Sequence, residues 1–291
     1  GFRPFFLFAA VWVILAMGLW LLVLAGLTAC NAEQSTLHVF GAEARAVRQM
    51  ALLLTIGAAV IVTIMVVLYV RAVRAPEGKL SHDRGMRMVL WMGAIGPTLI
   101  LTALLIYALP AMRPRATAPG DLVVRVDGEQ FWWRVAYDPA GDLSPLLSAN
   151  EVRIPVGRTV VFELTARDVI HSFWIPGLAG KMDMIPGRTN RLVVQAEKSG
   201  RYRGVCAEFC GLSHALMAFD VIAMDATDFD AWLRRSRAAS AGAIASRGAT
   251  LFDAHGCGGC HAIRGTSHDA RIGPDLSRFG ERRTMGAGIM P

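Results

Sequence analysis

Hydrophobic residues gather at the start of the chain in three runs without a charged side chain, over residues 4–32, 49–70 and 88–112. About 20 consecutive apolar residues are enough for an α-helix to cross a lipid bilayer. The runs therefore predict membrane-spanning helices, because buried helices of soluble proteins are seldom this long and uncharged. The third run contains Pro97, which is expected to kink its helix and is tolerated inside a membrane.

The loop between the second and third runs is basic. Within residues 71–87 it holds Arg71, Arg74, Lys79, Arg84 and Arg87. Cytoplasmic loops of membrane proteins are enriched in Lys and Arg, so this loop is predicted to be cytoplasmic. Residues 33–48 and everything after about residue 112 would then lie outside, which in a bacterium means the periplasmic face of the inner membrane.

The first run allows two interpretations. It ends in Leu27-Thr28-Ala29-Cys30, a pattern that lipoprotein signal peptidase cuts, after which Cys30 would carry lipid. Alternatively, residues 1–30 form a third retained helix. Both interpretations place residue 30 outside and leave the predicted topology unchanged.

Beyond residue 112 the pattern changes to short apolar or alternating stretches separated by Gly, Pro, Asp and Asn. Examples are DLVVRVDG, FWWRVAY, EVRIPVG and TVVFELTA, with NRLVVQAE, GRYRGVC and AFDVIAM farther on. Alternation with a period of two predicts strands that bury one face. We therefore expect an all-β, antiparallel sandwich, followed by an Ala- and Ser-rich helix and linker.

Composition excludes several classes of protein. Hydrophobic residues make up 54% of the 291 residues and charged residues 18%, against about 25% charged in an ordinary globular protein. These values exclude a disordered chain and argue against an entirely soluble one. The net charge is +7, but no basic stripe alternates with aromatic residues, so no nucleic acid is expected as a partner.

Side chains that favour soft metals lie close together in the sequence. They are Cys206, Cys210, His214 and Met217, with His171 upstream between two predicted strands. Thiolates, imidazoles and a thioether together favour copper. Zinc could take the two cysteines and two histidines but has little use for Met217. Two cysteines in one loop can bridge a pair of copper ions, each with one histidine, while Met217 and the carbonyl of Glu208 are weak axial ligands.

A second motif lies near the C-terminus. The sequence CGGCH over residues 257–261 is the attachment signal for c-type haem, in which Cys257 and Cys260 become thioethers and His261 binds the iron. A zinc site would need a second cysteine pair, and a thioredoxin-like motif would need a βαβ pattern around it. Neither accompanies this motif, so covalent haem is favoured.

The residues around this motif resemble class I cytochromes c. RGATLFDAHG is similar to their first helix, and IGPDLSRFG to the proximal loop, which implies that the carbonyl of Pro274 accepts a hydrogen bond from His261. We expect the distal ligand, a methionine, to lie beyond Pro291. Met285 and Met290 are then ordinary loop or packing residues.

A further resemblance concerns the copper residues. DVIHSFWIPGLAGKMDMIPGR and GRYRGVCAEFCGLSHALM resemble the copper-A domain of cytochrome c oxidase subunit II, a cupredoxin-like sandwich. With the two preceding helices, the resemblance covers about residues 31–230. It implies a binuclear copper-A centre held by His171, Cys206, Glu208, Cys210, His214 and Met217.

The same resemblance assigns two further roles. It implies that Glu208 also reaches a magnesium ion at the interface with subunit I. The stretch GEQFWWRVAY corresponds to the aromatic segment through which the family takes electrons from cytochrome c. Phe131, Trp132 and Trp133 are therefore the candidates for the point where electrons enter the domain.

A copper-A domain followed by a cytochrome c segment resembles subunit II of caa-type cytochrome c oxidases. This implies a path from a periplasmic donor such as cytochrome c to haem c, then to copper A, and then to haem a and the haem–copper site of subunit I, with subunit III as a further partner. Oxygen reduction to water and proton translocation would belong to the partner subunit. The resemblance therefore implies a cytochrome c oxidase without catalytic residues in this chain.

Other proteins use a similar domain. A copper-A nitric oxide reductase is the main alternative, because its electron path is similar and its substrate binds in another subunit. Nitrous oxide reductase carries a large soluble domain where this chain has apolar runs. A membrane-tethered copper carrier would not need a covalent haem, and quinol oxidase subunits lack the Cys206, Cys210 and His214 set.

The predicted organisation has five parts. They are a signal-like segment or extra helix (1–30), a transmembrane helical hairpin (31–112), a periplasmic cupredoxin-like domain (113–230), a linker (231–246), and an all-α class I cytochrome c domain (247–291) that we expect to be incomplete at its C-terminal end.

Overall fold

The computed structural model describes residues 12, 15, 18–19, 34–76, 78, 81–113, 115–137, 145–237 and 247–290. Cys30, most of the predicted segment 1–30 and the linker residues 238–246 lie outside the described residues. The chain divides into two compact units. One consists of residues 1–31 and 46–115, and the other of residues 32–45 and 116–291.

Apolar helices build the first unit. Helix α2 (Ala42–Arg74) is followed by α3 (His82–Leu90), a π-helical turn (Trp91–Ile95) and α4 (Gly96–Met112). The spans Ala42–Arg74 and His82–Pro110 are long and apolar enough to cross a membrane, and their most apolar stretches are not buried inside the protein. Helices that are apolar all round and uncovered need lipid or another apolar partner. The apolar helix pair predicted from the second and third runs is confirmed.

A π-helical turn lies just before Pro97, and the kink predicted there stays a prediction. The backbone N–H of Gly96 donates to the carbonyl of Trp91, five residues back. Pro97 has no N–H to continue the α-helical ladder, and a π turn redistributes the backbone bonds at such a point. A Cβ atom on residue 96 would lie 2.8 Å from the Trp91 carbonyl oxygen, which favours glycine there.

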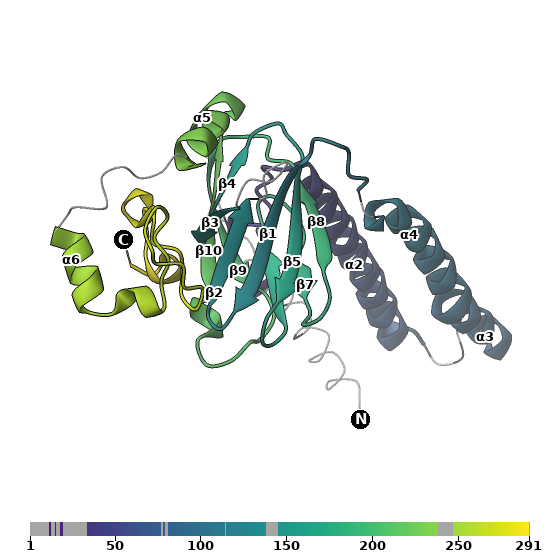
Figure 1. The fold of residues 1–291 in the computed structure, drawn as a ribbon. Coiled ribbons are helices and arrows are strands. Elements are labelled where there is room, and N and C mark those ends of the chain that lie inside the picture. The colour runs from purple at the N-terminus through teal and green to yellow at the C-terminus, as the bar shows by residue number, and fades with distance from the viewer. Residues whose placement is uncertain are drawn as a thin grey trace. The chain divides into compact units, whose positions relative to one another are not determined.

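The second unit contains a sandwich of two five-stranded sheets (Figure 1). In spatial order the first sheet consists of β3 (Leu146–Ala149), β2 (Trp132–Tyr137), β1 (Leu122–Glu129), β5 (Val160–Ala166) and β8 (Asn190–Val194). The second consists of β4 (Glu151–Pro155), β10 (Ala218–Met224), β9 (Gly200–Cys206), β6 (His171–Trp174) and β7 (Met182–Met184). The β-sandwich predicted from the alternating stretches is confirmed.

The strand directions differ from the prediction at two places. Strands β1 and β5 are parallel, and so are β4 and β10, whereas the other pairs are antiparallel. The expectation of a wholly antiparallel sandwich is therefore wrong. Alternation reports which face of a strand is buried, but it carries no information about the direction of a neighbour that lies far away in the sequence.

Aromatic rings fill the space between the sheets near the strand ends that carry the predicted copper ligands. Trp133, Phe173 and Phe219 are fully buried. The ring of Phe173 stacks on that of Phe219 with centroids 4.4 Å apart, and Trp133 packs edge-on against both at 5.5 and 5.1 Å. Rings packed this closely leave little room for movement, so they give the strand ends a rigid base.

The segments after β10 pack against the sandwich. In helix α5 (Ala226–Arg237), the rings of Phe229 and Trp232 lie 6.4 and 5.3 Å from that of Tyr137. Among residues 247–290 there is one α-helix, α6 (Arg247–Ala254), followed by 3₁₀ turns at Cys257–Gly259, Phe279–Glu281 and Gly286–Gly288. The predicted all-α cytochrome c domain stays a prediction.

Candidate metal centre

Two neighbouring antiparallel strands bring the predicted copper ligands together. His171 begins β6 and Cys206 ends β9. The loop 207–217, which we call the metal loop, then returns to β10, whose first residue Ala218 pairs with Val205 of β9. The loop is therefore closed at its base like a hairpin, and this closure holds the remaining candidate ligands next to the strand ends.

The sulfur and nitrogen atoms of these side chains converge. Cys206 Sγ lies 3.8 Å from Cys210 Sγ and 3.9 Å from His171 Nδ1. Cys210 Sγ lies 3.6 Å from His214 Nδ1 and 3.7 Å from Met217 Sδ. Both cysteines are buried and free of disulfides. The arrangement places one imidazole beside each sulfur and the thioether on the side of Cys210.

The main-chain carbonyl and the side-chain carboxylate of Glu208 contact different residues. Its carbonyl oxygen lies 3.2 Å from Cys206 Sγ, whereas its carboxylate lies 3.9 Å from the ammonium of Lys181. Lys181 also binds Asp183, which accepts a hydrogen bond from the hydroxyl of Ser172. That hydrogen bond and then the Lys181 ammonium lower the pKa of Asp183. The carboxylates of Glu208 and Asp183 thus share one lysine beside the metal loop.

Asp168 orients the buried imidazole of His171. Its Oδ1 lies 2.8 Å from His171 Nε2, and its Oδ2 accepts the backbone N–H of Gln130 at 2.7 Å. A carboxylate on Nε2 leaves Nδ1 as the ring atom that faces Cys206. Burial raises the pKa of Asp168, but its hydrogen bonds to His171 and to backbone N–H groups outweigh this and hold the pKa below the ordinary value.

The two thiols differ in their charge. Burial raises the pKa of Cys206, but hydrogen bonds from His171 and from backbone groups outweigh this and lower it to about 6. Burial and the neighbouring Cys206 charge raise the pKa of Cys210 to about 12. One thiolate beside a thiol is the arrangement expected of a metal-free pair, because two like charges this close repel. A positively charged metal would favour the second deprotonation.

We predict that replacing Asp168 with asparagine weakens copper binding. Asparagine keeps the shape but loses the charge that supports the His171 ring, and the loss of such a partner costs about 10- to 100-fold in metal affinity. Competition with a copper chelator measures the change. The matched control is Asp183→Asn, which removes a carboxylate from the next strand without touching His171. Equal affinities for the two variants would contradict the assigned role of Asp168.

The three aromatic candidates occupy different environments. Phe131 lies beside the metal loop, since a Cβ atom on Gly211 would come within 3.1 Å of its ring. Trp132 is partly exposed, with the guanidinium carbon of Arg134 4.6 Å from its ring centroid. Trp133 is fully buried, and its ring lies 6.1 Å from that of His171. Trp132 and Trp133 point to opposite faces of β2, as neighbours in a strand do.

The C-x-x-C-H motif forms a compact turn. Cys257 begins the 3₁₀ turn, and the backbone N–H of His261 donates to the carbonyl of Cys257 at 3.0 Å. His261 Nδ1 lies 2.8 Å from the carbonyl oxygen of Pro274. A Cβ atom on Gly273 would lie 2.5 Å from the imidazole, so only glycine lets this loop lie against the ring. Met285 and Met290 are about half exposed and pair with each other through their backbones.

Sequence reasoning missed the residues that support the predicted ligands. The carboxylate of Asp168 binds the imidazole of His171, and the side-chain amide of Gln130 donates to the carbonyl of Cys210 at 2.5 Å. The position of Asp168 three residues before His171 is a weak signal that could have identified it. Gln130 is 80 residues from Cys210, and no sequence pattern links the two.

Comparison with known proteins gives a family match that spans all six predicted copper ligands. Residues 137–224 match the family described as cytochrome C oxidase subunit II, periplasmic domain. The cytochrome c oxidase subunit 2 of Alkalihalophilus pseudofirmus is 42% identical over 165 residues, covering 56% of this chain and 46% of the relative. That of Bacillus subtilis is 33% identical over 205 residues, covering 66% and 56%. The chain spans about half the length of these curated relatives.

A solved structure gives a similar match. The periplasmic domain of subunit II of cytochrome oxidase from Bradyrhizobium japonicum is 30% identical and covers 43% of this chain and 97% of that chain, with a TM-score of 0.38. The family match ends at residue 224 and so does not reach the C-x-x-C-H motif.

Proposed function

We propose that this chain is the electron-accepting subunit of a haem–copper oxidase of the caa type, because residues 137–224 match the periplasmic domain of cytochrome c oxidase subunit II and the chain is 42% identical to one such subunit over 165 residues. It accepts electrons from a periplasmic donor such as cytochrome c and delivers them to subunit I, where oxygen is reduced and protons are translocated. The observation that carries the proposal is the convergence of two free, buried thiols with two imidazoles and a thioether.

The donor set fits a pair of copper ions. Cys206, Cys210, His171 and His214 would hold the pair, and Met217 and the Glu208 carbonyl would bind more weakly. When bound, such a centre supplies one-electron transfer with little change in bond lengths. The surrounding chain holds the ligands in place: Asp168 fixes the His171 ring, Gln130 fixes the carbonyl of Cys210, and the aromatic core excludes water.

The C-x-x-C-H turn fits a covalent haem. Cys257 and Cys260 would attach it, and His261 would bind the iron through Nε2 because Nδ1 is held by the carbonyl of Pro274. When bound, haem c supplies a second one-electron carrier on the same chain. The donor is then tethered, which raises its effective concentration at the copper domain.

An apolar surface beside the metal loop supports a protein partner there. Phe209, Leu212 and Leu216 are more than half exposed on this loop. Exposed apolar side chains gathered on one small loop are typical of an interaction surface. We assign this surface to subunit I, with the Glu208 carboxylate contributing to a magnesium site at the same interface. Subunit III completes the proposed complex.

The helix pair supports a membrane anchor. The basic loop of residues 71–87 is proposed to be cytoplasmic, which leaves the copper and haem residues on the periplasmic side of a bacterial inner membrane. The relatives named above are cytochrome c oxidases. Oxygen is therefore the proposed terminal acceptor, and the nitric oxide reductase alternative is not favoured.

The test is spectroscopic. The full chain is purified with its complex and examined by electron paramagnetic resonance and by a pyridine haemochrome assay after denaturation. We expect a signal from one electron shared equally by two copper ions, and one covalently bound c-type haem per chain. A single-copper signal, or bound zinc without copper, would overturn the copper assignment. Haem that is absent, or that is extracted by acidic acetone, would overturn the caa-type assignment and leave the copper assignment intact.

A further inference from the structure

Arg134 is buried although it points away from the core. Strand β2 alternates, with Trp133 and Val135 facing the inside of the sandwich and Trp132 and Arg134 facing outward. An outward-facing arginine on a sheet is normally solvated, yet the side chain of Arg134 is only 10% exposed. Another part of the chain therefore covers this outer face of β2.

Arg134 makes three contacts that join different parts of the chain. Its Nε donates to the carboxylate of Glu129 at 2.9 Å, and its guanidinium carbon lies 4.6 Å from the ring centroid of Trp132. Its Nη2 donates to the carbonyl oxygen of Arg271 at 2.8 Å. A planar guanidinium can make these contacts simultaneously, which a lysine ammonium cannot do. Arg134 is thus covered by the backbone of residues 262–290, which we call the C-terminal segment.

Arg271 begins the loop that supports the C-x-x-C-H motif. Two residues on, the backbone N–H of Gly273 donates to the carbonyl of Cys260 at 2.8 Å. The carbonyl of Pro274 then lies 2.8 Å from His261 Nδ1. Arg134 is therefore connected to the proposed haem ligand through a short stretch of loop that is itself hydrogen-bonded to the motif at both positions.

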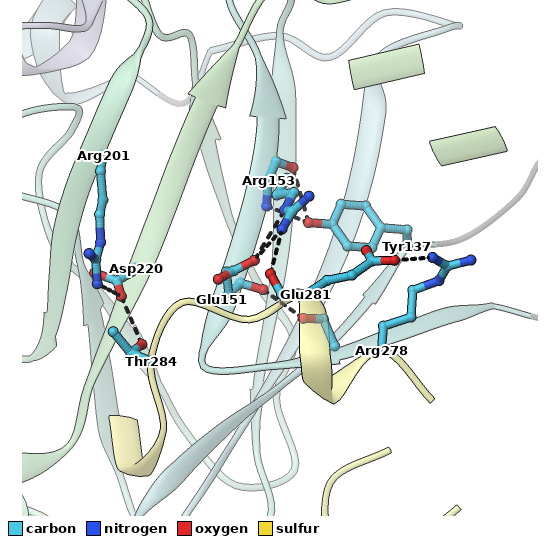
Figure 2. A network of polar contacts seen from close by, with 9 residues as sticks. Tyr137, Glu151, Arg153, Arg201, Asp220, Arg278, Glu281 and Thr284 are labelled. Carbon is cyan, nitrogen blue, oxygen red and sulfur yellow. Dashed lines mark hydrogen bonds and ion pairs between the residues drawn. The ribbon is translucent and has the colours of Figure 1, made fainter. Parts of the chain in front are cut away.

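Additional bonds hold the same segment farther along. Figure 2 shows Arg153, which pairs with Glu151 at 2.9 Å, donating to the carbonyl of Glu281 at 3.4 Å. The hydroxyl of Thr284 donates to the buried carboxylate of Asp220 at 3.2 Å. Ala287 is buried in the turn that packs on β10 and β2. The segment is thus attached at several points, which also include Arg264, whose Nη2 donates to the carbonyl of Pro145 at 2.8 Å.

We propose that Arg134 is a positioning residue that docks the C-x-x-C-H segment on strand β2 of its own chain, which makes Trp132 the point where electrons from haem c enter the copper domain. Trp132 lies under the docking arginine, and the next residue, Trp133, packs against the ring of His171. The step moves one electron from reduced haem c to the oxidised copper pair and makes or breaks no bond. This inference rests on the proposed function, because it needs both centres.

The test compares variants in the purified complex. Haem c is reduced by a flash from a ruthenium dye, and its reoxidation is followed together with reduction of the copper centre. We expect Arg134→Gln to slow this internal step about tenfold, the population change expected when a hydrogen bond to a charged group is lost. Arg134→Lys keeps the charge and is expected to restore little of the rate. Trp132→Leu is expected to slow the step without undocking the segment.

The matched control is Arg167→Gln. Arg167 also pairs with Glu129, at 3.3 Å, but its other partner is Asp127 rather than the C-terminal segment. We expect its internal rate to stay within about twofold of the wild-type value, the scatter expected of an exposed ion pair. A rate for Arg134→Gln equal to that of this control would overturn the docking role. An unchanged rate for Trp132→Leu would overturn its assignment as the point of electron transfer.

A second measurement separates docking from electron transfer. Amide hydrogen exchange of residues 262–290 is measured by mass spectrometry in the same complexes. We expect faster exchange in Arg134→Gln than in Arg167→Gln or Trp132→Leu, and equal exchange in all three would overturn the proposal. This comparison does not need haem. If no haem is attached, the proposed function fails while the docking role is still decided by exchange.

Discussion

Replacing Cys206 with serine is expected to abolish the shared two-copper signal and to lower oxygen consumption by the complex at least about 100-fold. Loss of a residue that only hydrogen-bonds to a metal ligand already costs up to that factor, and Cys206 is a proposed ligand itself. Cys206 Sγ lies 3.9 Å from His171 Nδ1 and 3.2 Å from the carbonyl oxygen of Glu208. A hydroxyl is a poor ligand for copper and cannot bridge two ions as a thiolate does. Copper content and electron paramagnetic resonance measure the outcome.

The chain contains its own control for this prediction. Cys257→Ser makes the same chemical change in the C-x-x-C-H turn and is expected to impair haem attachment while the copper signal persists. Retention of a two-copper signal in Cys206→Ser would show that the centre does not depend on a bridge by this thiol. Loss of the copper signal in both variants would indicate that misfolding, rather than ligand removal, explains the result.

The second large effect is expected from Gly204→Ala on strand β9. A Cβ atom at this position would overlap the ring of Phe219. That ring is stacked on Phe173 and packed against Trp133, so it cannot move aside. Overpacking of such a core costs about 3 kcal/mol in the free energy of unfolding. A thermal unfolding scan is expected to show a midpoint lower by roughly 10 °C.

Gly280→Ala serves as the matched control. An added Cβ atom at residue 280 would have no atom within 4 Å, so the expected change is within about 0.5 kcal/mol. The two variants are compared under the same conditions in the full chain. Similar midpoints would mean that the Phe219 ring relaxes at little cost and that the aromatic cluster is less rigid than its packing indicates.

Local patterns carried most of the fold prediction. Val124 and Val126 are fully buried while Arg125 between them is exposed, so alternation identifies both the strand and its inner face. The parallel partner of this strand, β5, begins 38 residues after it, at Val160 opposite Leu122. That pairing depends on how the whole chain closes on itself, and a local period cannot encode it.

In the candidate site, too, the sequence identifies residues by local patterns and misses contacts between distant residues. Cys206, Cys210, His214 and Met217 lie within one loop, so the sequence itself makes their proximity plausible. His171 was identified by its chemistry, and the pairing of β6 with β9 explains how it reaches the loop. Arg134 gave no signal, because a charged residue in an alternating strand is expected to be solvated and its partner is a backbone carbonyl 137 residues away.

Arg134 and Arg153 hold residues 262–290 through backbone carbonyl oxygens, which affects how the amino-acid sequence of this segment can vary. Arg134 and Arg153 bind the main chain of residues 271 and 281, so neither bond depends on the side chain at those positions. The carboxylate of Glu281 nevertheless has a partner of its own, because it accepts a hydrogen bond from Arg278 at 2.5 Å. Position 288 differs, because a Cβ atom there would lie 2.7 Å from the guanidinium of Arg203. Substitutions among related chains should therefore accumulate at 271 rather than at 281, where the carboxylate pairs with Arg278, while the arginines that hold the segment and the glycine at 288 are retained.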